Sequence, residues 1–413
     1  MGDDALMANI LLVHQNFPGQ FPHIAAALLT RGDKVAAIGG KTAQGQPGVD
    51  LRRWSNERGS TNGLFDIATR AEADMIRGSA AAATALKLKA DGFTPDVIIA
   101  HPGWGESLFL KEIWPAARVI NFGELLYRSR GGDINFDPEF GQESLAGNVR
   151  AHAKNATQVL AAAYADLIIC PTRFQADSYP PALQSTIRII HEGVDMERAQ
   201  RRAKATIKLP DGRVLDGSTP VITYVSRTLE PMRGFHIFMR ALPQFLAACP
   251  NAEVVVIGSA GLRGYGAASP NGRDWKSWLL EELGDRLDTT RVHFLGKVPH
   301  QTLIDAFSIS WAHIYYTYPF VLSWSLVEAM AAECLIIGSD TAPVREAITD
   351  GMEGVLLPFF DVEALARTMA KAVQEHRSLT PFRAAARRRA LQDYDRARGT
   401  ALWLQAIDEL IAR

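Results

Sequence analysis

Short apolar runs alternate with helical patterns along the whole chain, and this alternation limits the possible folds most strongly. The first series of apolar runs lies at residues 10–14, 35–38, 96–100, 118–121, 166–170 and 187–190. A second series lies at residues 221–225, 253–257, 292–295, 312–316, 334–337 and 354–357. Strands that alternate with helices form a parallel sheet covered on both faces. The sequence therefore predicts an α/β chain with two doubly wound, Rossmann-like domains.

The two series are separated by Met196 to Ser218, a polar, basic stretch that contains Gly and Pro but no core-strand pattern. Such stretches are typical of interdomain linkers. We predict an N-terminal domain over residues 1–197, a linker over 198–218, a C-terminal domain over 219–393 and a C-terminal helix over 394–413. Two domains of this kind bind ligands in the cleft between them, at the carboxyl ends of their strands.

The net charge, the N-terminal residues and the length of the apolar runs argue against several classes of protein. The 413 residues carry a formal net charge of -1, so no basic field argues for binding to nucleic acid. The acidic start, MGDDALMANI, leads directly into an apolar run and lacks the pattern of a secretory signal. No apolar run is long enough to span a membrane. We expect a cytoplasmic protein; peripheral contact with the inner face of the membrane and the oligomeric state stay open.

Several motifs occur in a familiar order in the second half of the chain. Residues 225–234 read Val-Ser-Arg-Thr-Leu-Glu-Pro-Met-Arg-Gly, and residues 325–330 read Ser-Leu-Val-Glu-Ala-Met. Together with 292–298, 342–346 and Asp350-Gly351, they resemble the C-terminal domain of the family-4, group 1 glycosyltransferases. The resemblance extends from Val221 to about Val373.

The N-terminal half carries motifs of the same family. Residues 14–21, His-Gln-Asn-Phe-Pro-Gly-Gln-Phe, look like the opening of an N-terminal domain from one branch of it, and residues 191–195 look like the motif that closes that domain. The resemblance implies the GT-B fold and sugar transfer with retention of anomeric configuration. It also implies that the final helix crosses back to pack on the N-terminal domain, and that the donor nucleotide-sugar binds in the C-terminal half of the cleft.

Two arginines are the first candidates for catalysis. Arg227 follows a predicted strand, and Arg233 precedes Gly234. A departing nucleoside diphosphate carries negative charge that must be stabilised, and guanidinium groups bind phosphate oxygens in a bidentate fork. The family usually has lysine at the second position, one residue closer to the first arginine. The alternative is a pair of surface cations at a helix start, where a cation opposes the helix dipole.

Glu328 and the segment before it are the next candidates. The resemblance assigns Glu328 to the ribose hydroxyls of the donor, whereas a capping box with Ser325 would instead make it a structural residue. The family has a second glutamate near the sugar, and this chain has Phe320 there. We expect the backbone amides of Val321, Leu322 and Ser323 to supply the remaining donor contacts at the helix start. Without that carboxylate, we favour substitution on the same face of the sugar over double displacement.

The other candidates follow predicted strands. His101 ends the strand at 96–100, and the resemblance gives it a catalytic contact to the donor sugar. Gly19 either lets the backbone approach the diphosphate or simply closes a turn. Further donor-binding candidates are Lys297, Val298 and Glu346, the last of which is equally compatible with a structural role. On the acceptor side the candidates are Glu124 and Trp104, with core packing as the alternative for the tryptophan.

The sequence therefore predicts a hexosyltransferase-like enzyme of polysaccharide biosynthesis that needs no cofactor. Its donor would be a nucleoside diphosphate-sugar, with UDP or GDP most favoured, and its acceptor a glycan, a lipid-linked sugar or a small molecule. No Asp-x-Asp pair lies at a predicted strand end, which indicates a metal-independent reaction. The alternatives are a nucleotide-sugar epimerase of the same fold, a catalytically silent sugar-nucleotide-binding protein, and an NAD-dependent oxidoreductase, which the absence of a G-x-G-x-x-G turn disfavours.

Overall fold

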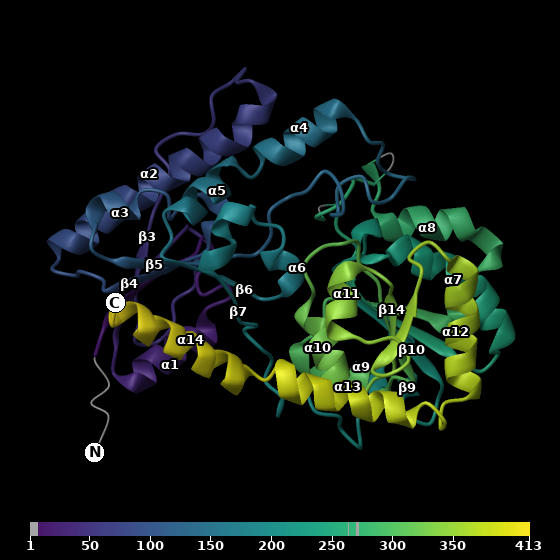
Figure 1. Ribbon diagram of the computed structural model, residues 1–413. Helices are drawn as coiled ribbons and strands as arrows, with labels where there is room; N and C mark the ends of the chain where they lie inside the picture. The colour runs from purple at the N-terminus through teal and green to yellow at the C-terminus, as the bar shows by residue number, and fades with distance from the viewer. Residues whose placement is uncertain (1–6, 263, 270–271) are drawn as a thin grey trace, which may run out of the picture. The chain divides into compact units, whose positions relative to one another are not determined.

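The computed structural model describes residues 7–262, 264–269 and 272–413. The chain divides into two compact units (Figure 1). Unit 1 comprises Met1–Arg130, Glu143–Glu192 and Arg396–Arg413, and unit 2 comprises Gly131–Gln142 and Gly193–Asp395. Each unit is built on a parallel sheet with helices on both faces, as the alternating pattern predicts.

The sheet of unit 1 has seven parallel strands in the order β3-β2-β1-β4-β5-β6-β7. Their bounds are β1 Asn9–Val13, β2 Lys34–Gly39, β3 Asp50–Arg53, β4 Val97–Ala100, β5 Arg118–Phe122, β6 Leu167–Cys170 and β7 Ile187–Ile189. The side chains of β1 alternate between two cores: Ile10 and Leu12 pack on one face, and Leu11 and Val13 on the other. Both faces are therefore apolar, which is why the strand appears in the sequence as an unbroken apolar run.

The helices of unit 1 are α1 Pro22–Arg31, α2 Thr69–Ala90, α3 Leu110–Ile113, α4 Leu145–Ala153, α5 Ala156–Ala163, α6 Arg173–Ala176 and α14 Arg396–Ile411. The last of them, α14, packs beside α1 although the two lie at opposite ends of the chain (Figure 1). Trp403, Ile407 and Leu410 of α14 are buried in the same core as Ile10 and Leu12. The prediction that the C-terminal helix returns to the N-terminal domain is confirmed.

The sheet of unit 2 has six parallel strands in the order β12-β11-β10-β13-β14-β15. Their bounds are β10 Val221–Thr228, β11 Glu253–Ser259, β12 Val292–Gly296, β13 Ala312–Tyr315, β14 Ile336–Ser339 and β15 Gly354–Leu357. The helices are α7 Phe235–Ala248, α8 Trp275–Leu283, α9 His300–Ile309, α10 Trp324–Ala331, α11 Ala342–Ala347, α12 Val362–Gln374 and α13 Thr380–Asp393. Helix α7 packs with α12, and α10 packs with α13.

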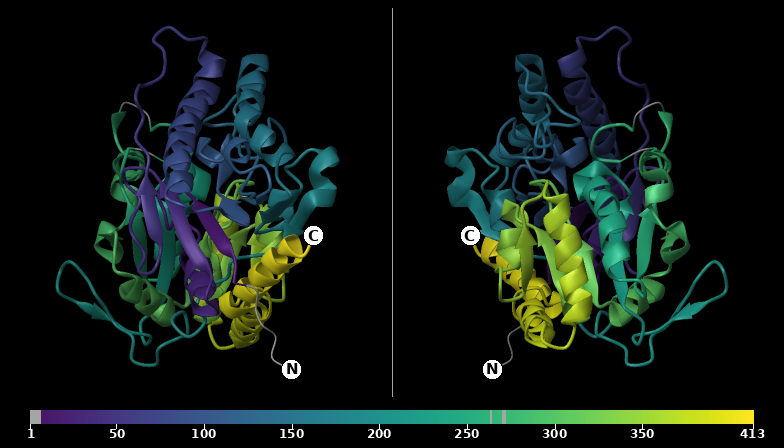
Figure 2. Two further views of the ribbon diagram at one scale, coloured as in Figure 1. Left: turned by 90° about the vertical axis from the view of Figure 1, so that its left-hand side faces the viewer. Right: turned by 90° about the vertical axis from the view of Figure 1, so that its right-hand side faces the viewer.

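Two segments of unit 2 come from outside its main run of strands. Gly131–Gln142 lies between β5 and α4 in sequence but belongs to unit 2, which the sequence did not predict. The segment predicted as a linker holds a two-stranded antiparallel ribbon, β8 Ile207–Lys208 and β9 Val214–Leu215, visible as the teal hairpin in Figure 2. Residues of this ribbon are buried with Val221. The predicted domain boundaries stay predictions.

The strand order fixes where a ligand would bind in each unit. In an open parallel sheet the connections turn in opposite directions on either side of one strand pair, and ligands bind at the carboxyl ends of that pair. This pair is β1 and β4 in unit 1, and β10 and β13 in unit 2. In the described part of the chain no helix is long and apolar enough to cross a membrane.

Candidate active site

The two predicted arginines lie near the carboxyl ends of β10 and β13 in unit 2, where each contacts a different loop. Arg227 lies inside β10, because this strand continues to Thr228 past a shift in its register with β11. The side chain is exposed, and its Nη1 donates to the hydroxyl of Tyr265 over 2.8 Å. The guanidinium also lies 5.8 Å from the centre of the Tyr265 ring. The predicted strand end at residue 225 was therefore three residues short of the end of β10.

Arg233 contacts a second loop, between β13 and α10. It ends the short 3-10 turn η4, Pro231–Arg233, directly before α7. Its Nη1 donates to Thr317 Oγ1 and to the carbonyl of Val321, each over 3.0 Å. Its guanidinium lies 5.4 Å from the centre of the Phe320 ring. Residues Thr317–Ser323, between β13 and α10, thus hold this arginine; we call them the β13 loop.

Aromatic rings connect the two arginines. The Phe320 and Tyr265 ring centres are 5.6 Å apart, so Arg227, Tyr265, Phe320 and Arg233 form a continuous arginine–aromatic row. In residues 7–262, 264–269 and 272–413, neither arginine forms an ion pair with a carboxylate. Arg263, a further basic residue of the Tyr265 loop, lies outside the described residues. The row therefore presents two cations whose charge no described acid neutralises.

Phe320 stands where the family has a glutamate, and its side chain is buried against the row. A phenyl ring cannot accept a sugar hydroxyl, and it does not neutralise the neighbouring guanidinium. A ring face instead attracts a cation electrostatically. The substitution thus leaves Arg233 fully charged toward a ligand, at the cost of a hydrogen-bond acceptor for the sugar.

The start of α10 differs from the sequence-based expectation. Helix α10 begins at Trp324, and its N-cap is Ser323, whose Oγ accepts from the amide of Ser325 over 3.3 Å. The capping-box alternative for Glu328, which required Ser325 as the cap, is therefore wrong. Ser323 also donates its own amide to the hydroxyl of Tyr315 over 2.7 Å. That amide is engaged within the protein, whereas the predicted donor contacts of Val321 and Leu322 stay predictions.

Glu328 meets a residue that the sequence did not single out. Its Oε1 lies 2.7 Å from Nε2 of His300, the first residue of α9. Lys297 and Val298 lie directly before this helix; Lys297 is exposed, and Val298 packs partly into the core. His300 therefore joins the end of β12, where these two donor-binding candidates lie, to the first turns of α10. Glu346 lies on α11, and its carbonyl accepts from Arg389 of α13.

In unit 1, a different set of side chains occupies the carboxyl ends of β1 and β4. His14 follows β1 and is buried; its Nδ1 accepts from the amide of Asn16 over 2.9 Å. The other nitrogen, Nε2, lies 2.6 Å from Gln20 Oε1, so it carries the proton. Burial, and then the proximity of His101, lower the pKa of His14 to about 4. This histidine is neutral at pH 7.

Glycine is required at position 19 partly because His14 lies close to it. Its backbone has a φ of +51°, in the left-handed region, and its amide closes a turn with the carbonyl of Asn16. A Cβ at this position would lie 2.2 Å from His14 Nε2. The turn alternative from the sequence thus accounts for this glycine without a ligand, and its contact with a diphosphate stays a prediction.

His101 follows β4 and is held from both sides. Its Nδ1 accepts from the amide of Gly103 over 3.1 Å, and its ring stacks on Trp104 with the ring centres 4.5 Å apart. Nε2 lies 3.3 Å from Glu124 Oε2 without forming a well-aligned hydrogen bond. The structure therefore brings together three candidates, His101, Trp104 and Glu124. Because Nδ1 accepts from the Gly103 amide, the histidine carries its proton on Nε2, which can donate to a ligand.

Glu106, an acid in the loop that follows β4 and carries His101, was missed by the sequence analysis. Glu106 is fully buried, and neither carboxylate oxygen has a hydrogen-bond partner among the described residues. Burial raises the pKa of Glu106 to about 7, a shift that Arg77 and His101 only partly oppose. A buried glutamate in a Gly-rich loop has no distinguishing pattern in the sequence, so only the packing reveals it.

A group of possible metal ligands lies elsewhere in unit 2. Ligand atoms of Asp137, Glu139 and His236 lie within 4.8 Å of one another. However, both oxygens of Glu139 accept from Arg240, over 2.6 and 2.7 Å, and Asp137 accepts from the Tyr318 hydroxyl. These protein partners already supply the positive charge and the donors that the acids require. The geometry favours an ion-pair network over a metal site here.

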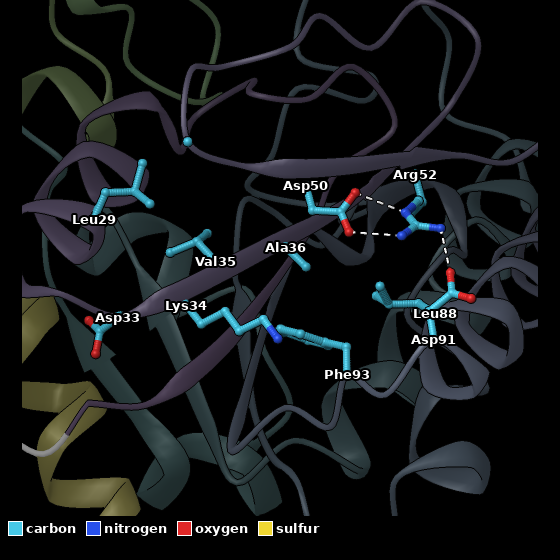
Figure 3. A pocket seen from close by; sticks show the side chains of 11 residues that line it. Leu29, Asp33, Lys34, Val35, Ala36, Asp50, Arg52, Leu88, Asp91 and Phe93 are labelled. Atoms are coloured by element: carbon cyan, nitrogen blue, oxygen red, sulfur yellow. Dashed lines mark hydrogen bonds and ion pairs between the residues drawn. The ribbon is translucent and has the colours of Figure 1, made fainter.

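A cavity of about 360 Å³ in unit 1 lies at the opposite end of the sheet (Figure 3). It is lined by the first residues of β2 and β3, Lys34 and Asp50, rather than by strand carboxyl ends. Arg52 bridges Asp50 and Asp91 there, over 2.8 and 2.7 Å. Because these charges are paired with one another and far from the strand ends, we do not place the donor site in this cavity.

Comparison with known proteins agrees with the motifs. The model described as "Glycosyl transferase family 4 group" matches residues 31–199, and that described as "Glycosyl transferases group 1" matches residues 208–389. Together they cover most of the chain. The chain belongs to the family-4, group 1 glycosyltransferases. The residues at the carboxyl ends of β10 and β13 lie within the second match.

Individual relatives of this family are distant. The chain is 29% identical to a phosphatidyl-myo-inositol mannosyltransferase of Mycolicibacterium smegmatis, over 47% of the chain and 45% of that protein. It is 27% identical to a D-inositol 3-phosphate glycosyltransferase of Streptomyces avermitilis, over 51% of the chain and 45% of that protein. The chain thus spans about half the length of these curated relatives.

Solved structures share the fold over nearly the whole chain. Sucrose-phosphate synthase from Thermosynechococcus elongatus superposes with a TM-score of 0.73 at 17% identity, covering 98% of this chain and 99% of that one. HepE from Anabaena, in complex with UDP and glucose, gives 0.65 at 17% identity, covering 97% and 100%. At these identities the likeness shows the fold, and it confirms the predicted GT-B class.

Proposed function

We propose that this chain transfers a sugar from a nucleoside diphosphate-sugar to an acceptor, with Arg227 and Arg233 binding the diphosphate. The observation that carries the proposal is the arginine–aromatic row: two guanidinium groups at the carboxyl ends of β10 and β13 that pair with no carboxylate among the described residues. Phosphate oxygens match the donor geometry of guanidinium, and the developing charge of the leaving diphosphate is greatest in the transition state. The protein itself thus provides the positive charge, which supports a metal-independent reaction.

Within this proposal the ribose binds at Glu328, the base lies near Lys297 and Val298, and His101 contacts the donor sugar. His101 Nε2 has no hydrogen-bond partner in the described structure, and its neighbours hold the ring in one orientation. Glu328 keeps one oxygen for the ribose diol while the other bonds His300. UDP or GDP is the proposed nucleotide; HepE, a fold neighbour, was solved with UDP and glucose.

We also propose that the transfer retains the anomeric configuration. Phe320 removes the carboxylate that a double displacement at this position would use, so we propose that the acceptor attacks on the face from which the diphosphate leaves. The departing phosphate then takes the acceptor proton, and the arginines stabilise the charge that remains. The acceptor is a glycan, a lipid-linked sugar or a small polyol; relatives of this chain are named for transfer to inositol derivatives.

A thermal-shift comparison of UDP, GDP, ADP and dTDP tests the donor site. A ligand that binds the folded state raises the melting temperature according to its affinity. We expect one nucleoside diphosphate to stabilise the parent most strongly, and we expect Arg227→Ala to abolish that shift. Arg367→Ala, an exposed arginine on α12, serves as the matched control and keeps the shift. Equal shifts in Arg227→Ala and the parent would remove Arg227 from the site.

Phe320 specifically favours one second candidate, a sugar-nucleotide-binding protein without transferase activity, since the acceptor of a sugar hydroxyl is missing there. Purified protein incubated with donor sugar, with and without a panel of polyol acceptors, separates the two. Release of the nucleoside diphosphate that depends on an acceptor supports transfer. Tight nucleotide binding without release supports the silent binding protein.

A further inference from the structure

The segment Gly131–Gln142 reaches into unit 2 and places one acid beneath the β13 loop. Asp137 is buried, with 4% of its surface exposed. Its Oδ2 accepts from the hydroxyl of Tyr318 over 2.6 Å and lies 3.0 Å from His236 Nε2. Its Oδ1 accepts from the amide of Glu139 over 2.9 Å. Among the residues that the structure describes, the inserted segment supplies the acid that contacts Tyr318 and His236.

The partners of Asp137 lie on the two elements that hold Arg233. His236 belongs to the first turn of α7, directly after the η4 turn that ends in Arg233. Tyr318 belongs to the β13 loop, and its amide donates to the carbonyl of Met232 in η4 over 2.9 Å. Arg233 in turn donates to Val321 of the same loop. Asp137 therefore closes a ring of contacts that includes η4, α7 and the β13 loop.

The rest of the inserted segment anchors Asp137 firmly. Glu139 forms a bidentate pair with Arg240 on α7, over 2.6 and 2.7 Å. Phe140 packs against His236 with ring centres 5.3 Å apart, and Phe136 packs against Tyr318 with ring centres 4.9 Å apart. Three neighbours of Asp137 in the segment thus contact α7 and the β13 loop. The position of the Asp137 carboxylate is therefore fixed, and its hydrogen bond can determine where Tyr318 lies.

The charge states suit a fixed hydrogen bond. Burial raises the pKa of Asp137, but the nearby His236 ring and the hydrogen bonds from Tyr318 and the Glu139 amide outweigh burial, so the pKa lies below its ordinary value. Burial and the hydrogen bond to Asp137 raise the pKa of Tyr318 well above its ordinary value. At neutral pH the Tyr318 hydroxyl is protonated and the Asp137 carboxylate is charged. The hydroxyl therefore donates a short, strong hydrogen bond to the carboxylate.

We propose that Asp137 is a positioning residue of the donor site: through Tyr318 it fixes the β13 loop, and thereby Arg233 and Phe320, for binding of the nucleoside diphosphate. This inference rests on the proposed function of the arginine–aromatic row. A carboxylate from the N-terminal half of the sequence thus completes the part of unit 2 that carries the arginines. Asp137 itself needs no contact with the donor.

Three variants and one control test the inference by calorimetric titration of UDP and GDP, the diphosphates favoured above. Asp137→Asn removes the charge, Tyr318→Phe removes only the hydroxyl, and the third variant combines both. We expect each single variant to weaken the Kd of the bound diphosphate about tenfold, the size of one lost charged hydrogen bond. Because both act through one contact, the double variant is expected to bind no more weakly than either single variant.

Tyr316→Phe is the matched control. Its hydroxyl is buried in the same region but has no hydrogen-bond partner among the described residues, so its loss leaves the diphosphate Kd unchanged. A merely structural role for Asp137 would lower the melting temperature and the fraction of binding-competent protein without altering Kd. Additive losses in the double variant, or an unchanged Kd in both single variants, would overturn the inference.

Diphosphate binding by the parent protein distinguishes a failure of this inference from a failure of the proposed function. If the parent binds neither diphosphate, the proposed donor site is wrong and the inference falls with it. If the parent binds one of them and Arg227→Ala abolishes the binding, while Asp137→Asn and Tyr318→Phe bind as the parent does, the donor site stands and only the role of Asp137 is refuted.

Discussion

The same edge of the two parallel sheets is chemically opposite in the two units. At the carboxyl ends of β1 and β4, His14, His101 and Glu106 are buried among aromatic rings, and burial shifts the pKa of His14 and of Glu106 toward the neutral forms. At the carboxyl ends of β10 and β13, Arg227 and Arg233 form no ion pair with any carboxylate that the structure describes. Burial thus favours the neutral forms of His14 and Glu106 at one edge, whereas the other edge presents two guanidinium charges.

This difference shows that a shared topology sets the place of a site but not its chemistry. The strand order gives both sheets a reversal point, and ligands bind there in either case. The side chains at that point decide the class of ligand: a neutral, ring-lined edge fits a sugar, whereas guanidinium groups fit a diphosphate. Four measurements would break or sharpen this contrast.

The largest effect is expected from the charged edge. Arg233→Ala should lower kcat/KM for the donor about 100- to 1000-fold, because a preorganised donor to the leaving diphosphate is lost. Steady-state kinetics with the best nucleotide-sugar measure this. The exposed Arg367→Ala on α12 should leave kcat/KM unchanged. A loss below threefold in Arg233→Ala would show that the charge at this edge is dispensable.

The uncharged edge should appear in the pH dependence of stability. Glu106 has an ordinary pKa of 4.5 and a folded-state pKa of about 7. Since the folded state binds its proton more tightly than the unfolded state, this group favours folding below pH 4.5, and the advantage is lost as pH rises through 7.

The difference in unfolding free energy between Glu106→Gln and the parent should therefore depend on pH. It should favour the variant at pH 8 by up to about 3 kcal/mol more than at pH 4.5. Urea unfolding at the two pH values measures the free energies. Exposed Glu363→Gln is the control, with no pH-dependent difference expected. A parent and a Glu106→Gln variant that differ equally at both pH values would show that Glu106 ionises freely.

A smaller effect is expected where the uncharged edge is tightly packed. Gly19→Ala should cost about 2 kcal/mol of unfolding free energy, since the added Cβ meets His14 in a left-handed backbone conformation. Gly63→Ala has a similar positive φ of 73° but open space around it, and should cost only about 1 kcal/mol. Equal costs for the two substitutions would mean that His14 moves aside freely.

The smallest effect is expected at His101. Asn at this position keeps an acceptor for the Gly103 amide and removes Nε2. His101→Asn should lower kcat/KM for the nucleotide-sugar about tenfold, the value of one hydrogen bond to the sugar, while the affinity for the free diphosphate stays the same. A matching loss in diphosphate affinity would place His101 at the charged edge and remove the contrast.

Much of the fold could be predicted because it depends on local pattern. The unbroken apolar runs, such as Ile10 to Val13, required a sheet covered on both faces, and the restart at Val221 required a second one. The positions of Arg227, Arg233 and His101 at strand ends followed from the same pattern. The helix start at Trp324 was misplaced because Ser323 and Ser325 are both good N-caps, and only the packed loop selects between them.

Other parts of the site depend on contacts between residues far apart in sequence. His300 meets Glu328, and Asp137 meets Tyr318, across separations that carry no periodic signal. Glu106 differs from any surface glutamate only in its burial. Nothing in the local sequence distinguishes such residues, because their roles are set by neighbours that the chain brings together only on folding.

The sequence by itself determined the two sheets, through the period of its apolar runs, and the family, through motifs of adjacent residues. The resemblance to that family in turn implied the returning C-terminal helix. Only the tertiary structure decided that Gly131–Gln142 belongs to unit 2 and that Phe320 lies on Arg233. It also decided that one sheet edge is neutral and the other charged. Burial and distance control pKa and charge pairing, and neither quantity exists until the chain is packed.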